Sequence, residues 1–239
     1  MPEHITRKEL KKDQFRDTLA QGADAILSHK NATMNALIVV IVAALAVFGW
    51  KTYSERQTVK ATAAFDAAMK SFQAPVRTLG QAIDPAQLSF ADDASKFSDA
   101  AQKFADAAAK FPRTHPGQLA GYYAALSYER LNKDAEARKY LQPLASGDSD
   151  FAAMARFELA QLDDRSGQAD AAAKLYQQLL DKPSVLVPKP LVLLAFAQHY
   201  AAKNPAEATR LYNQVKSEYP DTPVAEQADQ ELALLPGKS

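Results

Sequence analysis

Residues 169–183 read ADAAAKLYQQLLDKP, and this stretch decides the fold. A small residue, Ala172, is followed four positions later by a large one, Tyr176, and three positions after that by an apolar one, Leu179. Side chains three and four positions apart lie on one face of an α-helix. Pro183 marks the point at which such a helix stops. The stretch therefore predicts a short amphipathic helix that ends just before a proline.

The same pattern of a small, a large and an apolar residue occurs four times in the chain. Its leading alanines are separated by 37, 35 and 36 residues, and a proline follows three of the four copies. A period of this length is typical of stacked helical hairpins, in which no hairpin buries its apolar face alone. The four copies are Ala100, Phe104 and Ala107; Ala137, Leu141 and Leu144; Ala172, Tyr176 and Leu179; and Ala208, Tyr212 and Val215.

The helix that precedes each of the last three copies carries a second, weaker pattern. Its members are Gly121, Ala124, Ala125 and Tyr128; Leu159 and Ala160; and Leu193, Phe196, Ala197 and Tyr200. Together the two patterns resemble the tetratricopeptide repeat, although Arg156 and Asp163 stand where that family has large residues. The resemblance implies an all-α solenoid of helical hairpins over residues 93–236. A capping helix with Thr222 at its N-cap would close the array.

An apolar stretch, NALIVVIVAALAVFGWKTY, precedes the repeats, and residues 31–50 carry no charge. About 17–25 apolar residues are enough to cross the hydrocarbon layer as a helix. A cleaved signal would need a shorter N-terminal region and small residues after the apolar run, and a buried soluble helix rarely runs this long uncharged. We therefore predict a transmembrane anchor over residues 31–53, with Trp50, Lys51 and Tyr53 at one membrane interface.

The segments on either side of the span are predicted from local signals. Residues 1–30 form an amphipathic tail that begins with a capping box of Thr6 and Glu9. Residues 54–92 form a juxtamembrane helix and a connector. Four basic residues lie within twenty positions on each side of the span, so charge does not set its orientation. The passage of a long C-terminal domain favours a cytoplasmic tail, and a contact of the tail with lipid or with protein is left open.

Composition argues against chemistry in this chain. The 28 basic residues balance the 28 acidic ones, so no global charge favours nucleic acid. Cysteine is absent, which excludes disulfides and thiolate metal sites, and the four histidines are far apart in the sequence. Neither a glycine-rich phosphate loop nor converging carboxylates are found. We expect no catalytic residues, metal, cofactor or small-molecule substrate.

A surface for protein partners is the remaining expectation. In the tetratricopeptide repeat family, set positions of each first helix line a concave groove. The resemblance carries these positions onto Tyr122, Leu126, Glu129, Arg130, Phe157, Gln161, Asp164, Arg165, Leu194 and Gln198. Aromatic and arginine side chains are common anchors of interfaces. The equal alternative is that Tyr122 and Phe157 pack between repeats.

The order of tail, span, connector and repeats resembles the ancillary SecYEG translocon subunit family (YfgM-like). That resemblance implies a single-pass protein of the bacterial inner membrane, with a cytoplasmic N-terminus and a periplasmic repeat domain. It also implies contacts with the translocon and with periplasmic chaperones. The alternative is a scaffold of another envelope complex, in cell division or polymer secretion, with the same architecture and a different partner. An enzyme that uses the groove is the least favoured hypothesis.

Overall fold

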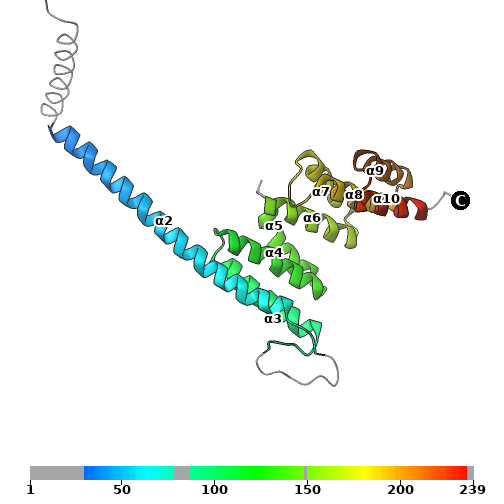
Figure 1. Ribbon diagram of the computed structural model, residues 1–239, viewed down its shortest axis with the longest axis horizontal. Coiled ribbons are helices and arrows are strands. Elements are labelled where there is room, and N and C mark those ends of the chain that lie inside the picture. The colour runs from blue at the N-terminus through cyan, green and yellow to red at the C-terminus, as the bar shows by residue number, and fades with distance from the viewer. Residues whose placement is uncertain (1–29, 78–86, 148–149, 236–239) are drawn as a thin grey trace, which may run out of the picture. The chain divides into compact units, whose positions relative to one another are not determined.

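The computed structural model describes residues 30–77, 87–147 and 150–235, and in these residues the chain is almost entirely helical. Their single isolated β-bridge joins Val76 to Phe90. The helices are α2 (Lys30–Gln73), α3 (Asp93–Lys110), α4 (His115–Arg130), α5 (Asp134–Ala145), α6 (Asp150–Arg165), α7 (Ala169–Asp181), α8 (Lys189–Ala201), α9 (Pro205–Glu218) and α10 (Pro223–Leu234) (Figure 1). The all-α prediction is confirmed. The predicted capping box of the tail lies outside the described residues.

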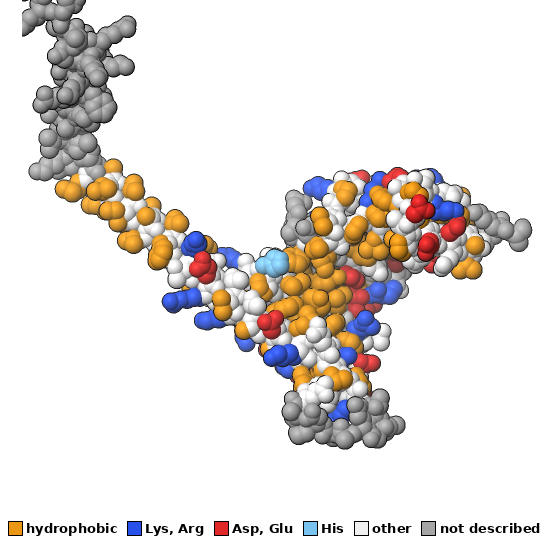
Figure 2. All heavy atoms as spheres, in the orientation of Figure 1, with side chains coloured by type: hydrophobic (Ala, Val, Ile, Leu, Met, Phe, Trp, Pro, Cys, Tyr) orange, Lys and Arg blue, Asp and Glu red, His pale blue; other side chains and the backbone are white. Residues whose placement is uncertain are grey.

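Helix α2 changes its character along its length. The chain divides into two compact units between Arg56 and Gln57, inside this helix. In the first unit the helix is apolar and reaches a mean hydropathy of 2.0 over an 18-residue window, none of it buried. By length and composition it meets the requirement for a membrane span. Figure 2 shows hydrophobic side chains covering this part of the helix, with charged ones appearing farther along.

The second unit is a stack of antiparallel helices. Contacts join α4 to α5, α6 to α7, and α8 to α9, and α10 packs on α9. The pairs α4–α5, α6–α7 and α8–α9 are helical hairpins of the kind that the sequence period predicts. Helix α3 packs closely on α4 and carries the first copy of the repeated pattern, which elsewhere lies on the second helix of a hairpin. Its hairpin therefore needs a first helix from the chain before it.

The C-terminal part of α2 supplies that first helix. Phe65 and Phe72 lie on α2 within the second unit, and their rings contact Phe104 of α3 and Tyr123 of α4. The ring centroids of Phe104 and Tyr123 are themselves 5.4 Å apart. Aromatic pairs at such separations stabilise a core beyond the area that they bury. Residues 57–73 are therefore part of the packed array.

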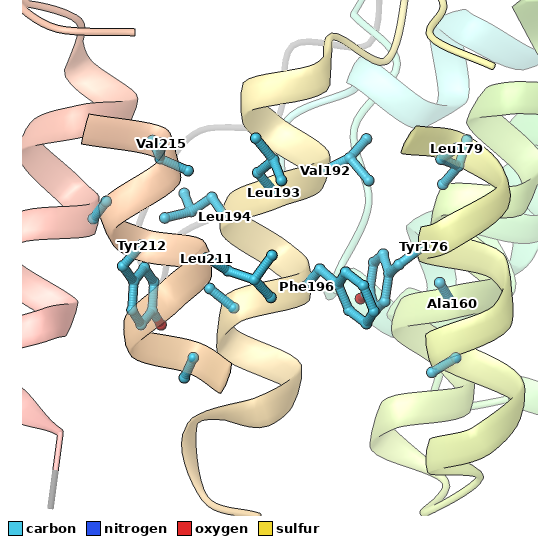
Figure 3. Close-up of a cluster of buried hydrophobic side chains, with 14 of the residues drawn as sticks. Ala160, Tyr176, Leu179, Val192, Leu193, Leu194, Phe196, Leu211, Tyr212 and Val215 are labelled. Carbon is cyan, nitrogen blue, oxygen red and sulfur yellow. The ribbon is translucent and has the colours of Figure 1, made fainter. Parts of the chain in front are cut away.

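The repeated sequence pattern lies in the core. Of its twelve members, only Leu144 is half buried, and the other eleven are buried. Figure 3 shows Tyr176 of α7 beside Phe196 of α8, and Leu211, Tyr212 and Val215 of α9 on the other side of α8. Small residues let the two helices of a hairpin approach, and the large ones fill the space to the next hairpin. The tetratricopeptide-like solenoid is confirmed in these residues.

Side-chain caps begin several of the helices. The Thr222 hydroxyl accepts a hydrogen bond from the backbone N–H of Ala225, which confirms the predicted N-cap of α10. Asp92 and Ser95 form a reciprocal capping box at the start of α3. Each cap satisfies backbone N–H groups that the first turn of a helix leaves without a partner.

The first turn of α4 needs a glycine at position 117. The Thr114 hydroxyl accepts a hydrogen bond from the Gly117 N–H, and this holds the first turn against the preceding loop. A Cβ atom on Gly117 would lie 1.9 Å from the carbonyl oxygen of Phe111. No side chain fits at that distance, so this glycine sets how closely α4 follows α3.

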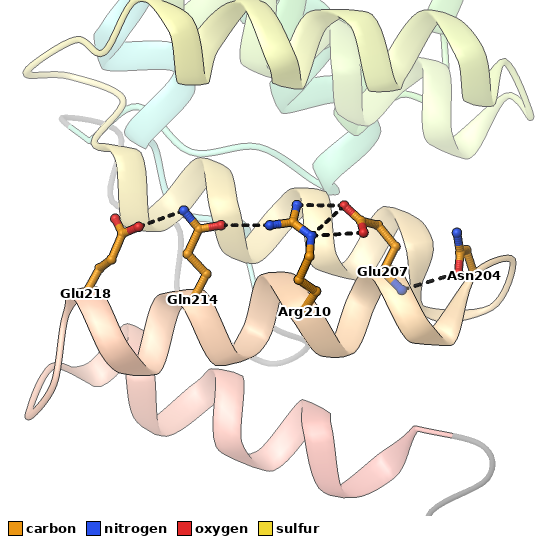
Figure 4. A network of polar contacts seen from close by, with 5 residues as sticks. All are labelled: Asn204, Glu207, Arg210, Gln214 and Glu218. Atoms are coloured by element: carbon orange, nitrogen blue, oxygen red, sulfur yellow. Dashed lines mark hydrogen bonds and ion pairs between the residues drawn. The ribbon is translucent and has the colours of Figure 1, made fainter.

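A chain of polar side chains runs along the exposed side of α9 (Figure 4). Arg210 donates to both carboxylate oxygens of Glu207 and to Gln214, and Gln214 in turn donates to Glu218. Lys189 at the start of α8 pairs with Glu218 at 2.9 Å. Pairs three and four residues apart on a helix each contribute a few tenths of a kcal/mol. The ladder therefore supports α9 without supplying its core.

Candidate partner-binding face

Polar contacts connect the first helices of successive hairpins. The Tyr122 hydroxyl of α4 donates to Glu158 Oε1 of α6 at 2.9 Å. Arg165 of α6 donates to Glu129 Oε2 of α4 at 2.6 Å. At the other end of the array, Gln198 of α8 donates to Glu231 of α10. These bonds identify the faces that α4 and α6 turn toward each other, and the faces that α8 and α10 turn toward each other.

Each of these faces continues as a stripe along its helix, because residues three, four and seven positions apart lie on one side. We call the four stripes together the first-helix face. Its members are Gln118, Tyr122, Leu126 and Glu129 on α4; Met154, Glu158, Gln161 and Arg165 on α6; Leu191, Ala195 and Gln198 on α8, continued by Ala202; and Val224, Gln227, Glu231 and Leu234 on α10.

The end of this face formed by α4 and α6 is acidic and poorly hydrated. Burial raises the pKa of the Glu158 carboxyl, while the hydrogen bond from Tyr122 and the charge of Arg165 lower it less. Burial also raises the pKa of Glu129, against the hydrogen bond from Arg165, and the charge of Glu158 raises it further. Glu129 Oε1 is buried and accepts no hydrogen bond. Two carboxylates here share one guanidinium.

The end formed by α8 and α10 carries two exposed leucines and a single charged residue. Leu191 is 39 % exposed and Leu234 is 79 % exposed. Ala195 and Val224 are half buried, and Ala202 is exposed. On the α8 stripe no described side chain carries a formal charge at neutral pH, and Glu231 is the one charged residue on the α10 stripe. Contiguous exposed apolar surface marks interaction sites, whereas a single exposed apolar side chain is common on any protein surface.

Six of the ten residues predicted to bind a partner fall on the first-helix face. They are Tyr122, Leu126, Glu129, Gln161, Arg165 and Gln198. Tyr122 is only 8 % exposed, so it offers little surface to a partner. The guanidinium of Arg165 is about half exposed, and Gln198 is exposed. Their contact with a partner stays a prediction.

The other four predicted residues make contacts inside the array. Leu194 is 4 % exposed and lies in the core around Tyr176 and Tyr212. Phe157 is half buried, and its ring meets the edge of Tyr176. The Arg130 guanidinium lies 5.8 Å from the centre of the Phe97 ring. Partner binding by these side chains also stays a prediction.

Asp164, the last of these four, is the centre of a small internal network. Its Oδ2 accepts a hydrogen bond from the Tyr176 hydroxyl at 3.0 Å, and its Oδ1 contacts His199 Nδ1. The His199 side chain is 3 % exposed and lies among the rings of Tyr176, Phe196 and Tyr200. The network joins α6, α7 and α8, so it fixes how one hairpin stacks on the next.

Sequence reasoning missed Glu158, Leu191 and Glu231. The repeat alignment placed Phe157 at the position equivalent to Tyr122, whereas the hydrogen bond of Tyr122 reaches the next residue, Glu158. Tyr122 and Glu158 are 36 residues apart, which falls within the 35–37-residue spacing of the repeats. This spacing was the signal that could have identified Glu158 as a neighbour of Tyr122. Within the described residues, no group of three or more His, Asp or Glu side chains is arranged to hold a metal ion.

Comparison with known proteins agrees with this geometry. Residues 28–183 match the family described as tetratricopeptide repeat-like domain, and residues 191–222 match the tetratricopeptide repeat. The first match covers more than half of the chain and includes the apolar part of α2. No curated protein matches the chain.

Two similar solved structures contain nearly identical tetratricopeptide-like repeats of a candidate kinesin light chain from Podosopora anserina. The first is 15% identical and covers 74% of this chain and 85% of its own, with a TM-score of 0.54. The second, a point-substituted form, is also 15% identical and covers 74% of this chain and 84% of its own, with a TM-score of 0.55. At this identity the likeness concerns the fold alone.

Proposed function

The chain belongs to the tetratricopeptide repeat-like domain family, and from this premise we propose that it is a membrane-anchored scaffold for protein partners. Residues 31–53 are the anchor in this proposal, and Trp50, Lys51 and Tyr53 lie at one interface. The first-helix face receives the partner. The repeat array has no catalytic role in this proposal and acts by holding proteins at the membrane.

The observation that carries the proposal is the composition of α2. Its described apolar part exposes every large hydrophobic side chain, from Ile41 at 49 % to Phe48 at 69 %. An uncharged helix of this length with no protein packed on it is expected in lipid rather than in water. The same helix then enters the packed array at residues 57–73. A single helix thus unites a membrane segment with a protein-binding fold.

More specifically, we place this scaffold among ancillary subunits of the bacterial SecYEG translocon. The tail is cytoplasmic, the anchor crosses the inner membrane once, and the repeats are periplasmic, where they bind translocon and chaperone components. The order of the parts supports this reading, because it resembles that family. A scaffold of another envelope complex, in cell division or polymer secretion, would have the same order, so partner identity separates the two.

Site-specific crosslinking in intact membranes tests the proposal. A photoreactive residue replaces Gln198 or Arg165, which are exposed on the first-helix face. The matched control replaces Lys174, an exposed residue of α7 on the side opposite its buried Tyr176. We expect translocon or periplasmic chaperone subunits to be crosslinked from the first-helix face and not from Lys174. Recovery of only cell-division or polymer-secretion proteins would favour the alternative, and equal recovery from all three positions would contradict a role for this face.

Orientation is tested with single cysteines, because the natural chain has none. Lys133→Cys lies in the exposed turn between α4 and α5, and Gln14→Cys lies in the tail. A membrane-impermeant maleimide added to spheroplasts is expected to label the first variant and to label the second only after lysis. The opposite result would reverse the topology.

A further inference from the structure

The two ends of the first-helix face differ in chemistry, and this difference restricts what can bind there. At the α4–α6 end, Arg165 is the one cation of the stripes and bonds Glu129, whereas Glu158 accepts a hydrogen bond from a neutral phenol. Two carboxylates against one guanidinium leave a net charge of −1. Acidic side chains in this arrangement attract a positive group and repel a negative one.

The contacts of these carboxylates are also incomplete. One oxygen of Glu129 is buried without a hydrogen-bond donor. Burial raises the pKa of both Glu129 and Glu158, which means that neither carboxylate recovers within the protein all the solvation that it loses. A partner ammonium or guanidinium group placed beside these carboxylates would stabilise both charges.

The α8–α10 end favours a different kind of side chain from the partner. Leu191 and Leu234 present exposed apolar surface. Ala195 and Ala202 are small and leave the backbone of this helix easy to approach. Apolar side chains of a partner would remove this surface from water, at about 25 cal/mol for each Å² buried.

From this arrangement we infer that the first-helix face binds a partner segment that has lysine or arginine at one end and large apolar side chains at the other. The positive group lies against Glu129 and Glu158, and the apolar group lies against Leu191 of α8 and Val224 of α10, each seven residues before the bonded pair of Gln198 and Glu231. This inference rests on the proposed function, because it assumes that the first-helix face is the binding surface. It adds the chemical class of the partner and the direction in which it lies.

The spacing of the helices gives the length of this segment. Packed helices lie about 8–10 Å apart, so two helix spacings separate the two ends of the face by roughly 20 Å. An extended chain advances about 3.3 Å for each residue, so about six residues connect the positive group to the apolar group. A segment in which the two groups are adjacent would reach only one end.

Synthetic peptides test the inference directly on the full chain in lipid nanodiscs. The probe is a fluorescein-labelled decapeptide with two lysines and a Leu-Phe pair separated by six Gly and Ser residues. One control peptide has glutamates in place of the lysines, and another has serines in place of Leu-Phe. Fluorescence anisotropy is expected to show binding of the lysine peptide that is about tenfold tighter than that of either control.

Matched variants of the protein locate the site. Glu158→Gln removes one charge from the acidic end and is expected to weaken the lysine peptide about fivefold, whereas the glutamate peptide should bind no more weakly than before because one repulsive charge is lost. Asp181→Asn removes one charge from an exposed position at the end of α7 and is expected to change nothing. Circular dichroism of both variants checks that the helices are retained. Equal binding of the lysine and glutamate peptides, or equal effects of the two variants, would overturn the inference.

The pH dependence supplies a second measurement. Glu129 and Glu158 have raised pKa values, so they lose their charge at a higher pH than an ordinary glutamate does. Binding of the lysine peptide is therefore full above these pKa values and falls as the pH drops through them. In the double variant Glu129→Gln/Glu158→Gln this fall should disappear. A fall of the same size in the double variant would assign the effect to other groups and contradict the inference.

The outcomes for the two proposals are distinguishable. If crosslinking from Gln198 captures translocon or chaperone subunits but the captured segments lack a positive group, the scaffold function stands and the inference about partner chemistry fails. If crosslinking from the first-helix face captures no protein, the proposed function fails, whichever peptide binds in solution.

Discussion

The hairpins α6–α7 and α8–α9 place a tyrosine at equivalent positions, 36 residues apart, and give it different surroundings. Tyr176 is 1 % exposed, and its hydroxyl donates to Asp164. Tyr212 is fully buried, and its hydroxyl has no hydrogen-bond partner. The residue of α8 that corresponds to Asp164 is Ala201, because the turn from α8 to α9 is one residue shorter, and an alanine offers no side-chain acceptor. The shared feature is the volume of the aromatic side chain, so the ring and not its hydroxyl sets the repeat geometry.

Polar contacts of the α6–α7 hairpin extend this difference. Asp163 has a side chain that is 4 % exposed, and it pairs with Arg138 of α5 at 2.6 Å. One repeat later the corresponding residue is Tyr200, and its neighbour His199 contacts Asp164. Burial and the charge of Glu231 raise the pKa of Tyr212 to about 12, so its hydroxyl keeps its proton at neutral pH. The α6–α7 hairpin thus combines a polar network with its core, and the α8–α9 hairpin relies on packing.

Removing the rings is expected to have the largest effect and to erase the difference between the hairpins. Tyr176→Ala and Tyr212→Ala each leave a large cavity and should lower the free energy of unfolding by about 3–5 kcal/mol. Urea unfolding of the full chain in detergent micelles, followed by circular dichroism, measures both. A much smaller loss for Tyr212→Ala would show that the last hairpin contributes little to the stability of the array.

Breaking the buried ion pair is the next largest change and affects only the α6–α7 side. Asp163→Ala leaves Arg138 without its carboxylate and should cost about 2 kcal/mol. This is less than the loss for a fully buried pair, because the Arg138 side chain is 25 % exposed and regains water. The double variant Arg138→Ala/Asp163→Ala should be less destabilised than the sum of the two single variants. Additive losses would mean that the pair is not coupled.

Removing only the hydroxyls should separate the two tyrosines. Tyr176→Phe takes a donor from Asp164 and is expected to cost about 1 kcal/mol. Tyr212→Phe removes a buried hydroxyl that has no partner and should be neutral or stabilising by up to about 1 kcal/mol. The same urea titration compares the two variants. Equal losses would contradict the account of the two hairpins given above.

The smallest effect is expected on the surface of α9. Arg210→Ala breaks the ladder that joins Glu207 to Gln214, yet the Arg210 side chain is 58 % exposed. Exposed pairs of this kind contribute about 0.5 kcal/mol or less. The midpoint of thermal unfolding should therefore hardly change, and raising the salt concentration should reduce even this difference. A large loss would mean that the ladder, and not the core, stabilises the α8–α9 hairpin.

The solenoid follows from sequence spacing because its core positions recur at a nearly constant period. Ala172, Tyr176 and Leu179 are buried for the same reason that their equivalents are, so one copy is enough to interpret the others. The first hairpin is harder to recognise, because its first helix is the end of α2. Phe65 and Phe72 show helical spacing, but they carry no copy of the family pattern.

The candidate face is less predictable than the fold. Its contacts depend on how much each first helix shifts relative to the next, and the repeats are 35 to 37 residues long. A difference of one residue turns a helix by about 100°, which is enough to exchange Phe157 for Glu158. The capping box of Thr6 and Glu9 lies outside the described residues and stays a prediction.

The role of residues 57–73 has a practical consequence for truncation. A version of the chain that begins after Gln73 would lose the rings of Phe65 and Phe72 and leave Phe104 and Tyr123 uncovered. Such a protein should aggregate for a reason unrelated to the membrane. A version that begins at Gln57 removes the whole apolar segment and keeps all four hairpins. Water-soluble forms for binding measurements should therefore start inside α2, at the boundary between the two units.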